Sequence, residues 1–171
     1  MKVLILNGSP RAGGNTAAMC DAFREGAEAA GHTVETVQAG RMDIGGCRAC
    51  EYCHGEGQGA CVQKDGMQKI YPLLAEAEFV VLASPIYYFA PTAQLQAAVQ
   101  RMYALMRPEK VRRMALLLSS GSPGVYNAAV CQYKDMLSYL GIGNSGIITA
   151  SGRENKSPDK LEEIRAFART I

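Results

Sequence analysis

The sequence of 171 residues has neither a strong excess of one charge nor a long apolar run. Its 18 Lys and Arg residues stand against 16 Asp and Glu residues, so the formal net charge is only +2. A protein that binds nucleic acid by neutralising phosphates usually carries a larger basic excess, so we do not expect nucleic acid as a partner. No apolar run approaches the roughly 20 residues that a membrane span requires, so a membrane is not an expected partner either.

The N-terminal segment also lacks the features of a secretory signal. Its apolar stretch, Val3 to Leu6, is shorter than the roughly 7–15 residues of a signal core, and no small-residue cleavage site follows it. We interpret this stretch as a first β-strand and expect a cytoplasmic protein. The sequence has no internal repeats. Its composition, with 48% hydrophobic and 20% charged residues, excludes a disordered, collagen-like or coiled-coil chain. A single domain over residues 1–171 fits this length.

Apolar and amphipathic segments alternate along the chain. Apolar or alternating runs predict strands at residues 2–7, 32–37, 79–84, 114–119 and 146–150. Amphipathic periods predict helices at residues 15–30, 67–77, 92–106, 125–140 and 158–169. Asn15 is the expected N-cap of the first helix, and Pro72 is compatible with a break in the second. The alternation predicts an α/β protein with helices on both faces of a parallel sheet.

Several cysteines and methionines fall within these predicted helices. We expect them to be core residues, because both side chains behave as apolar groups that fill gaps. They are Cys20, Cys131, Met102, Met106 and Met136.

The segment after the first predicted strand, residues 7–16 (NGSPRAGGNT), combines glycines with hydroxyl, amide and guanidinium groups. Such a strand-to-helix loop directs backbone N–H groups and a helix N-terminus toward its occupant. The side chains that add donors are Ser9, Arg11, Asn15 and Thr16. The loop matches neither the Walker A motif nor GxGxxG, so a monophosphate fits it better than ATP or a dinucleotide. The alternative interpretation is a turn that merely needs glycines and a cap.

Two further strand ends carry residues suited to a ligand, and the carboxyl ends of parallel strands meet at one edge of the sheet. Residues 84–91 (SPIYYFAP) place three consecutive aromatics between prolines, and exposed aromatic clusters usually mark binding surfaces. A rigid loop of this kind suits a flat heteroaromatic ring. A subunit contact or a core plug is the alternative. Residues 119–124 (SSGSPG) offer hydroxyls and backbone donors on the same rim.

GSPRxxGNT after the first strand, SPIYY after the third and the cysteine-rich insertion between them resemble the flavodoxin-like NADPH-dependent FMN reductase family. The resemblance extends over essentially the whole chain. It implies a three-layer, doubly wound, flavodoxin-like sandwich with a five-stranded parallel sheet in the order 2-1-3-4-5, and FMN as the cofactor. It assigns the FMN phosphate to Ser9, Arg11, Asn15 and Thr16. It assigns the isoalloxazine ring to Pro85, Ile86, Tyr87, Tyr88, Ser120 and Gly121.

Four of the six cysteines fall in an insertion without regular periodicity, residues 39–66. Their pattern is Cys47-x2-Cys50-x2-Cys53-x7-Cys61, and thiols clustered at two-residue gaps indicate metal or redox chemistry. A compact C-x2-C-x2-C run with a fourth cysteine nearby suits a 4Fe–4S cluster, and within the family it resembles the iron–sulfur flavoproteins. Zinc, a disulfide pair, and redox-active or unliganded thiols are the alternatives.

The sequence therefore predicts a flavin-dependent oxidoreductase or electron-transfer protein that pairs FMN with an iron–sulfur cluster. Because the redox chemistry is that of the cofactors, we name no side chain as a general acid or base. The alternatives are an NAD(P)H-dependent FMN or quinone reductase without a cluster, and a flavin-binding sensor or carrier. NAD(P)H is the candidate electron donor, and a small molecule or a protein is the expected redox partner. The aromatics of residues 87–89 and the cysteine insertion predict the subunit contacts of a homodimer or homotetramer.

Overall fold

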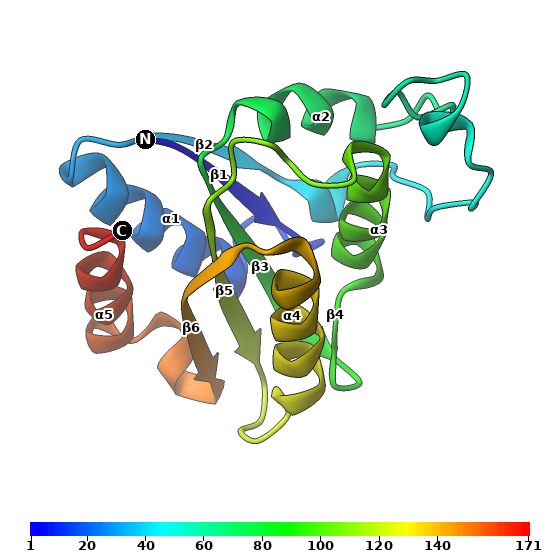
Figure 1. Cartoon of the computed structure of the whole chain (residues 1–171). Helices are drawn as coiled ribbons and strands as arrows, with labels where there is room; N and C mark the ends of the chain where they lie inside the picture. Colours follow the sequence, from blue (N-terminus) through cyan, green and yellow to red (C-terminus); the bar gives the residue numbers. More distant parts are fainter.

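A parallel β-sheet forms the middle layer of the computed structural model, which describes residues 1–171 (Figure 1). Its strands are β1 (Lys2–Asn7), β2 (Thr33–Val37), β3 (Phe79–Tyr87), β5 (Arg113–Ser120) and β6 (Gly143–Ser151). Their order, β2-β1-β3-β5-β6, confirms the predicted order 2-1-3-4-5. The two-residue β4 (Ala90–Pro91) pairs antiparallel with the end of β3 and forms a hairpin with it. This pairing extends β3 beyond its predicted end at Ser84.

Helices cover both faces of the sheet (Figure 1). Helices α1 (Asn15–Ala29) and α5 (Pro158–Ala168) cover one face, and α2 (Met67–Glu76), α3 (Ala93–Arg101) and α4 (Asn127–Leu140) cover the other. Successive side chains of a strand point to opposite faces. Accordingly, Leu4 and Leu6 pack beneath α2–α4, whereas Val3 and Ile5 pack beneath α1 and α5. Burial on both faces explains why the central strands are continuous apolar runs.

Three details of the helices differ from the sequence predictions. Asn15 is the first residue of α1 and Gly14 occupies the cap position, so the predicted Asn15 cap is wrong. Pro72 lies inside α2 without ending it. Helix α3 ends at Arg101, and the chain continues as a short 3₁₀ turn, Met102–Leu105.

Two of the predicted core residues are exposed. Met106 lies beyond the end of α3 and has a positive φ of 54°, which takes it out of the helical pattern. Cys131 lies on the solvent face of α4, because the buried positions of this helix are Ala129, Tyr133 and Leu137. The core assignments of Cys20 and Met102 are confirmed, and Met136 packs partly buried against the core.

The cysteine insertion, residues 39–66, contains two single-turn 3₁₀ helices, Ala39–Arg41 and Tyr52–His54, and is otherwise irregular. It projects beyond α2 and α3, away from the tips of β3 and β5 (Figure 1, cyan to teal). Its last residue meets the chain near its start, because the Gly66 N–H donates to the Asp43 carbonyl at 2.8 Å. A Cβ at position 66 would lie 2.9 Å from that carbonyl oxygen, so this closure requires glycine.

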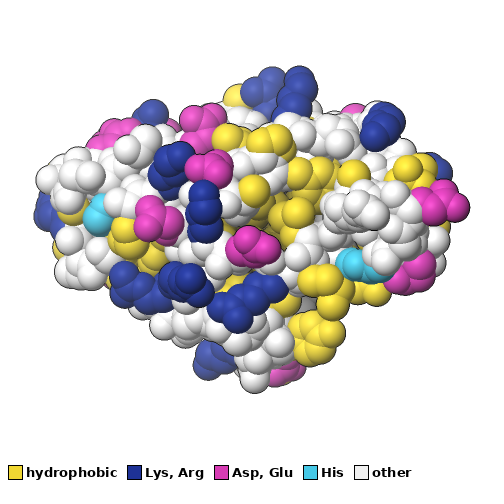
Figure 2. Space-filling view, turned by 45° about the horizontal axis from the view of Figure 1, so that its top comes forward, with side chains coloured by type: hydrophobic (Ala, Val, Ile, Leu, Met, Phe, Trp, Pro, Cys, Tyr) yellow, Lys and Arg dark blue, Asp and Glu magenta, His cyan; other side chains and the backbone are white.

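The surface on the side of α2 carries positive and negative side chains interspersed around a central apolar area (Figure 2). No helix of the structure combines the length and the apolar character needed to cross a bilayer.

Candidate functional site

The loops that follow β1, β3, β5 and β6 meet in a polar cleft with a volume of about 230 Å³. The residues that line it are Ser9, Arg11, Gly14, Asn15, Thr16, Pro85, Ile86, Tyr87, Ser119, Ser120, Gly121, Gly152 and Asn155. Every residue that sequence reasoning assigned to FMN is among them, except Tyr88. Tyr88 is 98% exposed in the turn between β3 and β4, where its φ of 47° and the 65° of Phe89 take the chain away from the sheet edge.

The loop after β1 is held in place by its own polar side chains. Asn7 Oδ1 accepts from the Ser9 backbone N–H at 2.9 Å, and Ser9 Oγ accepts from the Arg11 backbone N–H at 3.2 Å. Thr16 Oγ1 and Ser119 Oγ lie 2.8 Å apart and join this loop to the end of β5. No side chain caps the N-terminus of α1. The first N–H groups of the helix are therefore free of a side-chain partner and suited to an anion.

Thr92 joins this loop to the hairpin after β3. Its Oγ1 donates to the Gly8 carbonyl at 2.7 Å and accepts from the Leu95 N–H at 3.3 Å, so that it also caps α3. Its backbone N–H donates to Ser84 Oγ at 2.9 Å. Gly8 is required here, because a Cβ would lie 2.5 Å from Leu95 Cβ. The two loops are thus fixed relative to each other by buried contacts.

A third side of the cleft comes from the segment after β6, which sequence reasoning missed. Asn155 is 1% exposed, and its Nδ2 donates to the carbonyls of Ser120 at 2.8 Å and Gly152 at 2.9 Å. Its Oδ1 is buried and has no partner within the protein. The sequence could have predicted this contribution, because β6 is also a parallel strand and its carboxyl end reaches the same edge of the sheet.

The four cysteines of the insertion line a second, smaller cavity of about 20 Å³, together with Arg101, Tyr103 and other residues. Cys47 and Cys50 are exposed, whereas Cys53 and Cys61 are each 9% exposed. All six cysteines of the chain are free thiols in the structure, which does not contain the alternative disulfide. No three His, Cys, Asp or Glu side chains converge as ligands of a single ion.

The two buried thiols of this cavity differ in their tendency to ionise. Burial raises the pKa of Cys53. Burial acts in the same direction on Cys61, but the Gln63 backbone N–H, the Tyr71 hydroxyl and the Arg101 guanidinium outweigh it and lower its pKa. Cys61 is therefore the more acidic of these two thiols.

The polar cleft and the cysteine cavity lie at opposite ends of α3. Thr92, at the N-terminus of this helix, contacts the cleft loops, and Arg101, at its C-terminus, lines the cysteine cavity. The nine residues of α3, Ala93–Arg101, extend about 14 Å at 1.5 Å per residue. The two sites of one chain are therefore not in contact.

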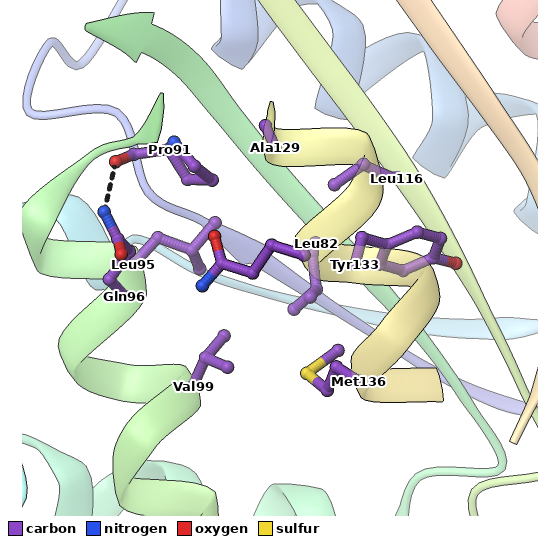
Figure 3. Close-up of a pocket in the computed structure, with 10 residues that line it drawn as sticks. Leu82, Pro91, Leu95, Gln96, Val99, Leu116, Ala129, Tyr133 and Met136 are labelled. Atoms are coloured by element: carbon purple, nitrogen blue, oxygen red, sulfur yellow. Dashed lines mark hydrogen bonds between the residues drawn. The ribbon is translucent and has the colours of Figure 1, made fainter. Parts of the chain in front are cut away.

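A narrow groove of about 30 Å³ lies between α3 and α4 (Figure 3). It is lined mainly by apolar side chains, including Val99 and Met136, and no charged group lines it. Gln96 Nε2 donates to the Pro91 carbonyl at 2.9 Å at its edge. The groove therefore lacks the positive charge that would favour a phosphorylated ligand.

Residues 1–152 match the family described as NADPH-dependent FMN reductase. The chain belongs to this family. Membership implies FMN, and the polar cleft, with its uncapped helix N-terminus and convergent hydroxyls, has the donor set that a nucleotide monophosphate needs. The cleft lies at the carboxyl ends of the strands, where ligands of such sheets bind.

The relatives of this chain include proteins named iron-sulfur flavoprotein. One from Archaeoglobus fulgidus is 39% identical over 102 residues, which are 60% of this chain and 46% of that protein. Another, from Methanosarcina thermophila, is 34% identical over 107 residues, which are 63% of this chain and 55% of that protein. The chain thus spans about half the length of the curated relatives it matches.

Solved structures of other proteins share the fold of this chain. An NAD(P)H:quinone oxidoreductase from Methanothermobacter marburgensis superposes with a TM-score of 0.75 at 19% identity, over 99% of this chain and 93% of the other. The fold is the flavodoxin-like α/β sandwich expected from the sequence.

Proposed function

We propose that this protein is a flavin-dependent oxidoreductase that binds FMN in the polar cleft and an iron–sulfur cluster in the cysteine segment. The observation that carries the flavin assignment is the convergence of four strand-end loops on one polar cleft. When bound, FMN exchanges electrons singly or in pairs and a cluster exchanges them singly. The task of the chain is to bind and orient both groups.

The FMN phosphate would lie at the N-terminus of α1. Ser9, Asn15 and Thr16 supply neutral donors there, and Arg11 is an exposed cation with a forked geometry suited to phosphate. The isoalloxazine ring would lie against residues 85–87, with Ser120 and Gly121 at its other side. In this arrangement the unpartnered Oδ1 of Asn155 would be the acceptor for a donor group of the nucleotide.

The cysteine segment fits a 4Fe–4S cluster by its donor set. Four thiols line one cavity, and a cubane needs one thiolate at each of four separate irons. A zinc site of four thiolates usually has two separated pairs, whereas this segment has three cysteines at successive two-residue gaps. The names of the relatives support the cluster.

A reductase without a cluster, with NAD(P)H as electron donor and a quinone or FMN as acceptor, is the second candidate. The small volume of the cysteine cavity, about 20 Å³, favours it, because the segment would have to open to admit a cluster. Steady-state NAD(P)H oxidation that is undiminished in Cys50→Ser would support this candidate.

Calorimetry of the apoprotein with FMN and with riboflavin tests the flavin site. Because Arg11 is assigned to the phosphate, Arg11→Ala should weaken FMN binding by about 10- to 100-fold, which corresponds to losing a charge-assisted hydrogen bond. Riboflavin binding should not change. Arg41→Ala is the control, because Arg41 is also exposed and does not line the cleft. If the apoprotein takes up no FMN, the proposed function is wrong.

Iron and labile-sulfide analysis after anaerobic purification tests the cluster. We expect equal amounts of iron and sulfide, and their loss in Cys50→Ser. Cys131→Ser is the matched control, since Cys131 is an exposed thiol on α4, outside the cavity. Wild-type protein without iron would remove the cluster from the proposal and leave the cluster-free reductase.

A further inference from the structure

Arg101 is the largest fully buried side chain of the molecule, with an exposed fraction of 1%. Burial of a guanidinium is unfavourable unless its charge and its hydrogen-bond donors are matched. Arg101 Nη1 donates to Asp65 Oδ2 at 2.6 Å and to the Gly45 carbonyl at 2.9 Å, and Nη2 donates to the Gln63 carbonyl at 3.4 Å. Its Nε is buried without a partner.

These bonds connect the two sides of the cysteine segment. Gly45 precedes the first cysteine of the motif, and Gln63 and Asp65 follow the last. Asp65 strengthens the closure, because its Oδ2 also accepts from the Gly45 N–H at 3.1 Å. All four cysteines therefore lie within a stretch of chain whose ends are bound to one guanidinium from α3.

The positive charge of this pair faces the thiols. Arg101 lines the cysteine cavity with all four cysteines, whereas Asp65 does not line it. The carboxylate therefore balances the guanidinium from outside the cavity. Because both groups are largely removed from water, their interaction with the cavity is screened less than that of a surface charge.

We propose that Arg101 is a positioning residue of the cluster site, which closes the cysteine segment and presents a fixed positive charge to four thiolates. The inference rests on the proposed function, because it assumes that the thiolates hold a cluster. A cluster bound by four thiolates carries net negative charge, and reduction adds one more negative charge. A buried cation beside it should therefore favour the reduced form and raise the reduction potential.

Potentiometric titration of the anaerobically purified holoprotein tests the charge, with two variants that change it in opposite directions. Arg101→Met removes the cation and leaves Asp65, so the cluster potential should fall. Asp65→Asn removes the anion and leaves Arg101, so the potential should rise. A purely structural role would disturb the segment in both variants and would not separate them by sign. Arg48→Met is the control: Arg48 lines the same cavity but is exposed, so its shift should be smaller.

Limited proteolysis of the apoprotein tests the closure without any cofactor. Cleavage within residues 45–65 should be at least tenfold faster in Arg101→Met than in wild type. Arg101→Lys should restore little protection, because an ammonium cannot reproduce a planar fork that bonds three acceptors. Circular dichroism verifies that each variant is folded. If Arg101→Met does not fold, Asp65→Asn alone provides the charge test.

Potentials that shift in the same direction in Arg101→Met and Asp65→Asn, or that do not shift in either, would overturn the charge assignment. Unchanged cleavage of residues 45–65 in Arg101→Met would overturn the closure. Failure of the proposed function gives a different result, since wild-type protein would then contain no iron. That result removes the charge assignment together with the cluster, and the proteolysis of the apoprotein still decides the closure.

Discussion

Asn155 donates two hydrogen bonds from one amide nitrogen, to the carbonyls of Ser120 and Gly152, and thereby ties the loop after β5 to the segment after β6. Its oxygen is buried and unpartnered, which is unusual because buried polar groups are nearly always hydrogen-bonded. The amide nitrogen of Asn155 therefore holds two segments together, and its amide oxygen remains available as an acceptor.

Asn155→Ala removes both halves of this amide. The loss of two buried hydrogen bonds should lower the free energy of unfolding of the apoprotein by about 1–3 kcal/mol, measured by urea denaturation. FMN affinity should fall as well, measured by calorimetry. Asn127→Ala, at an exposed position of α4, is the control and should change stability by less than about 0.5 kcal/mol. Unchanged FMN affinity in folded Asn155→Ala would contradict the role of its oxygen.

At the scale of the element, α3 connects the two candidate sites, and its first turn is fixed by Thr92. The hydroxyl of Thr92 serves two buried groups, the Gly8 carbonyl and the Leu95 N–H. It therefore sets the position of the helix relative to the loop that follows β1. A helix held in this way at its start and through Arg101 at its end gives both sites a common rigid support.

Thr92→Val retains the shape of the side chain and removes the hydroxyl. We expect a loss of about 1–3 kcal/mol in the free energy of unfolding, because a cap is lost and a buried carbonyl is left unpaired. Chemical denaturation measures this loss. Thr92→Ser should recover most of the stability, since it restores the hydroxyl. A Val variant as stable as wild type would show that the two hydrogen bonds contribute nothing.

The 3₁₀ turn Gly152–Lys156, which carries Asn155 toward the cleft, begins with a capping box between Ser151 and Glu154. The hydrogen bond with Lys160 is the main cause that lowers the pKa of Glu154 below its ordinary value of 4.5, and the hydrogen bond from the Ser151 N–H acts in the same direction. A carboxyl whose pKa is lowered on folding adds stability above its unfolded pKa and loses it as the pH falls through the folded pKa.

Glu154→Gln should therefore be less stable than wild type at pH 7 by about 0.5 kcal/mol, the scale of an exposed ion pair. The difference should shrink below pH 4.5 and vanish once Glu154 is protonated in the folded state. Urea denaturation at a series of pH values measures it. Glu109→Gln, at an exposed position, is the control. A difference that grows on acidification would contradict the assignment.

For the assembly of the molecule, we propose that the exposed aromatics of the β3–β4 hairpin form a contact between subunits of the expected homodimer or homotetramer. Tyr88 is 98% and Phe89 58% exposed, and aromatic anchors often carry the binding energy of interfaces. In sedimentation experiments, Tyr88→Ser with Phe89→Ser should weaken self-association at least tenfold, while Tyr139→Ser, exposed on α4, should not. A wild-type protein that is monomeric at all concentrations would refute this prediction.

The sequence predicted those features that depend on local patterns. Apolar periodicity identified the strands and helices, and the rule that parallel strands end at one edge brought the loops at Ser9, Pro85 and Ser120 together. Features that depend on distant contacts were missed. Asn155 follows the last strand, and the partners of Arg101 lie 36 to 56 residues away, so no local pattern could predict its burial.

The hydrogen bond between Asp43 and Gly66 has a consequence for the modularity of this fold. Since the two residues already meet, splicing out residues 44–65 and joining the ends by a short turn would leave every strand and all five α-helices in place. Arg101 would lose its partners, and an apolar replacement would suit its position. Gln68 would lose its bonds to the Cys61 and Gln63 carbonyls, and Tyr103 would lose its bond to Glu51. A scaffold of this family can thus gain or lose the whole cysteine segment through one insertion or deletion, with further substitutions confined to the residues that contact it.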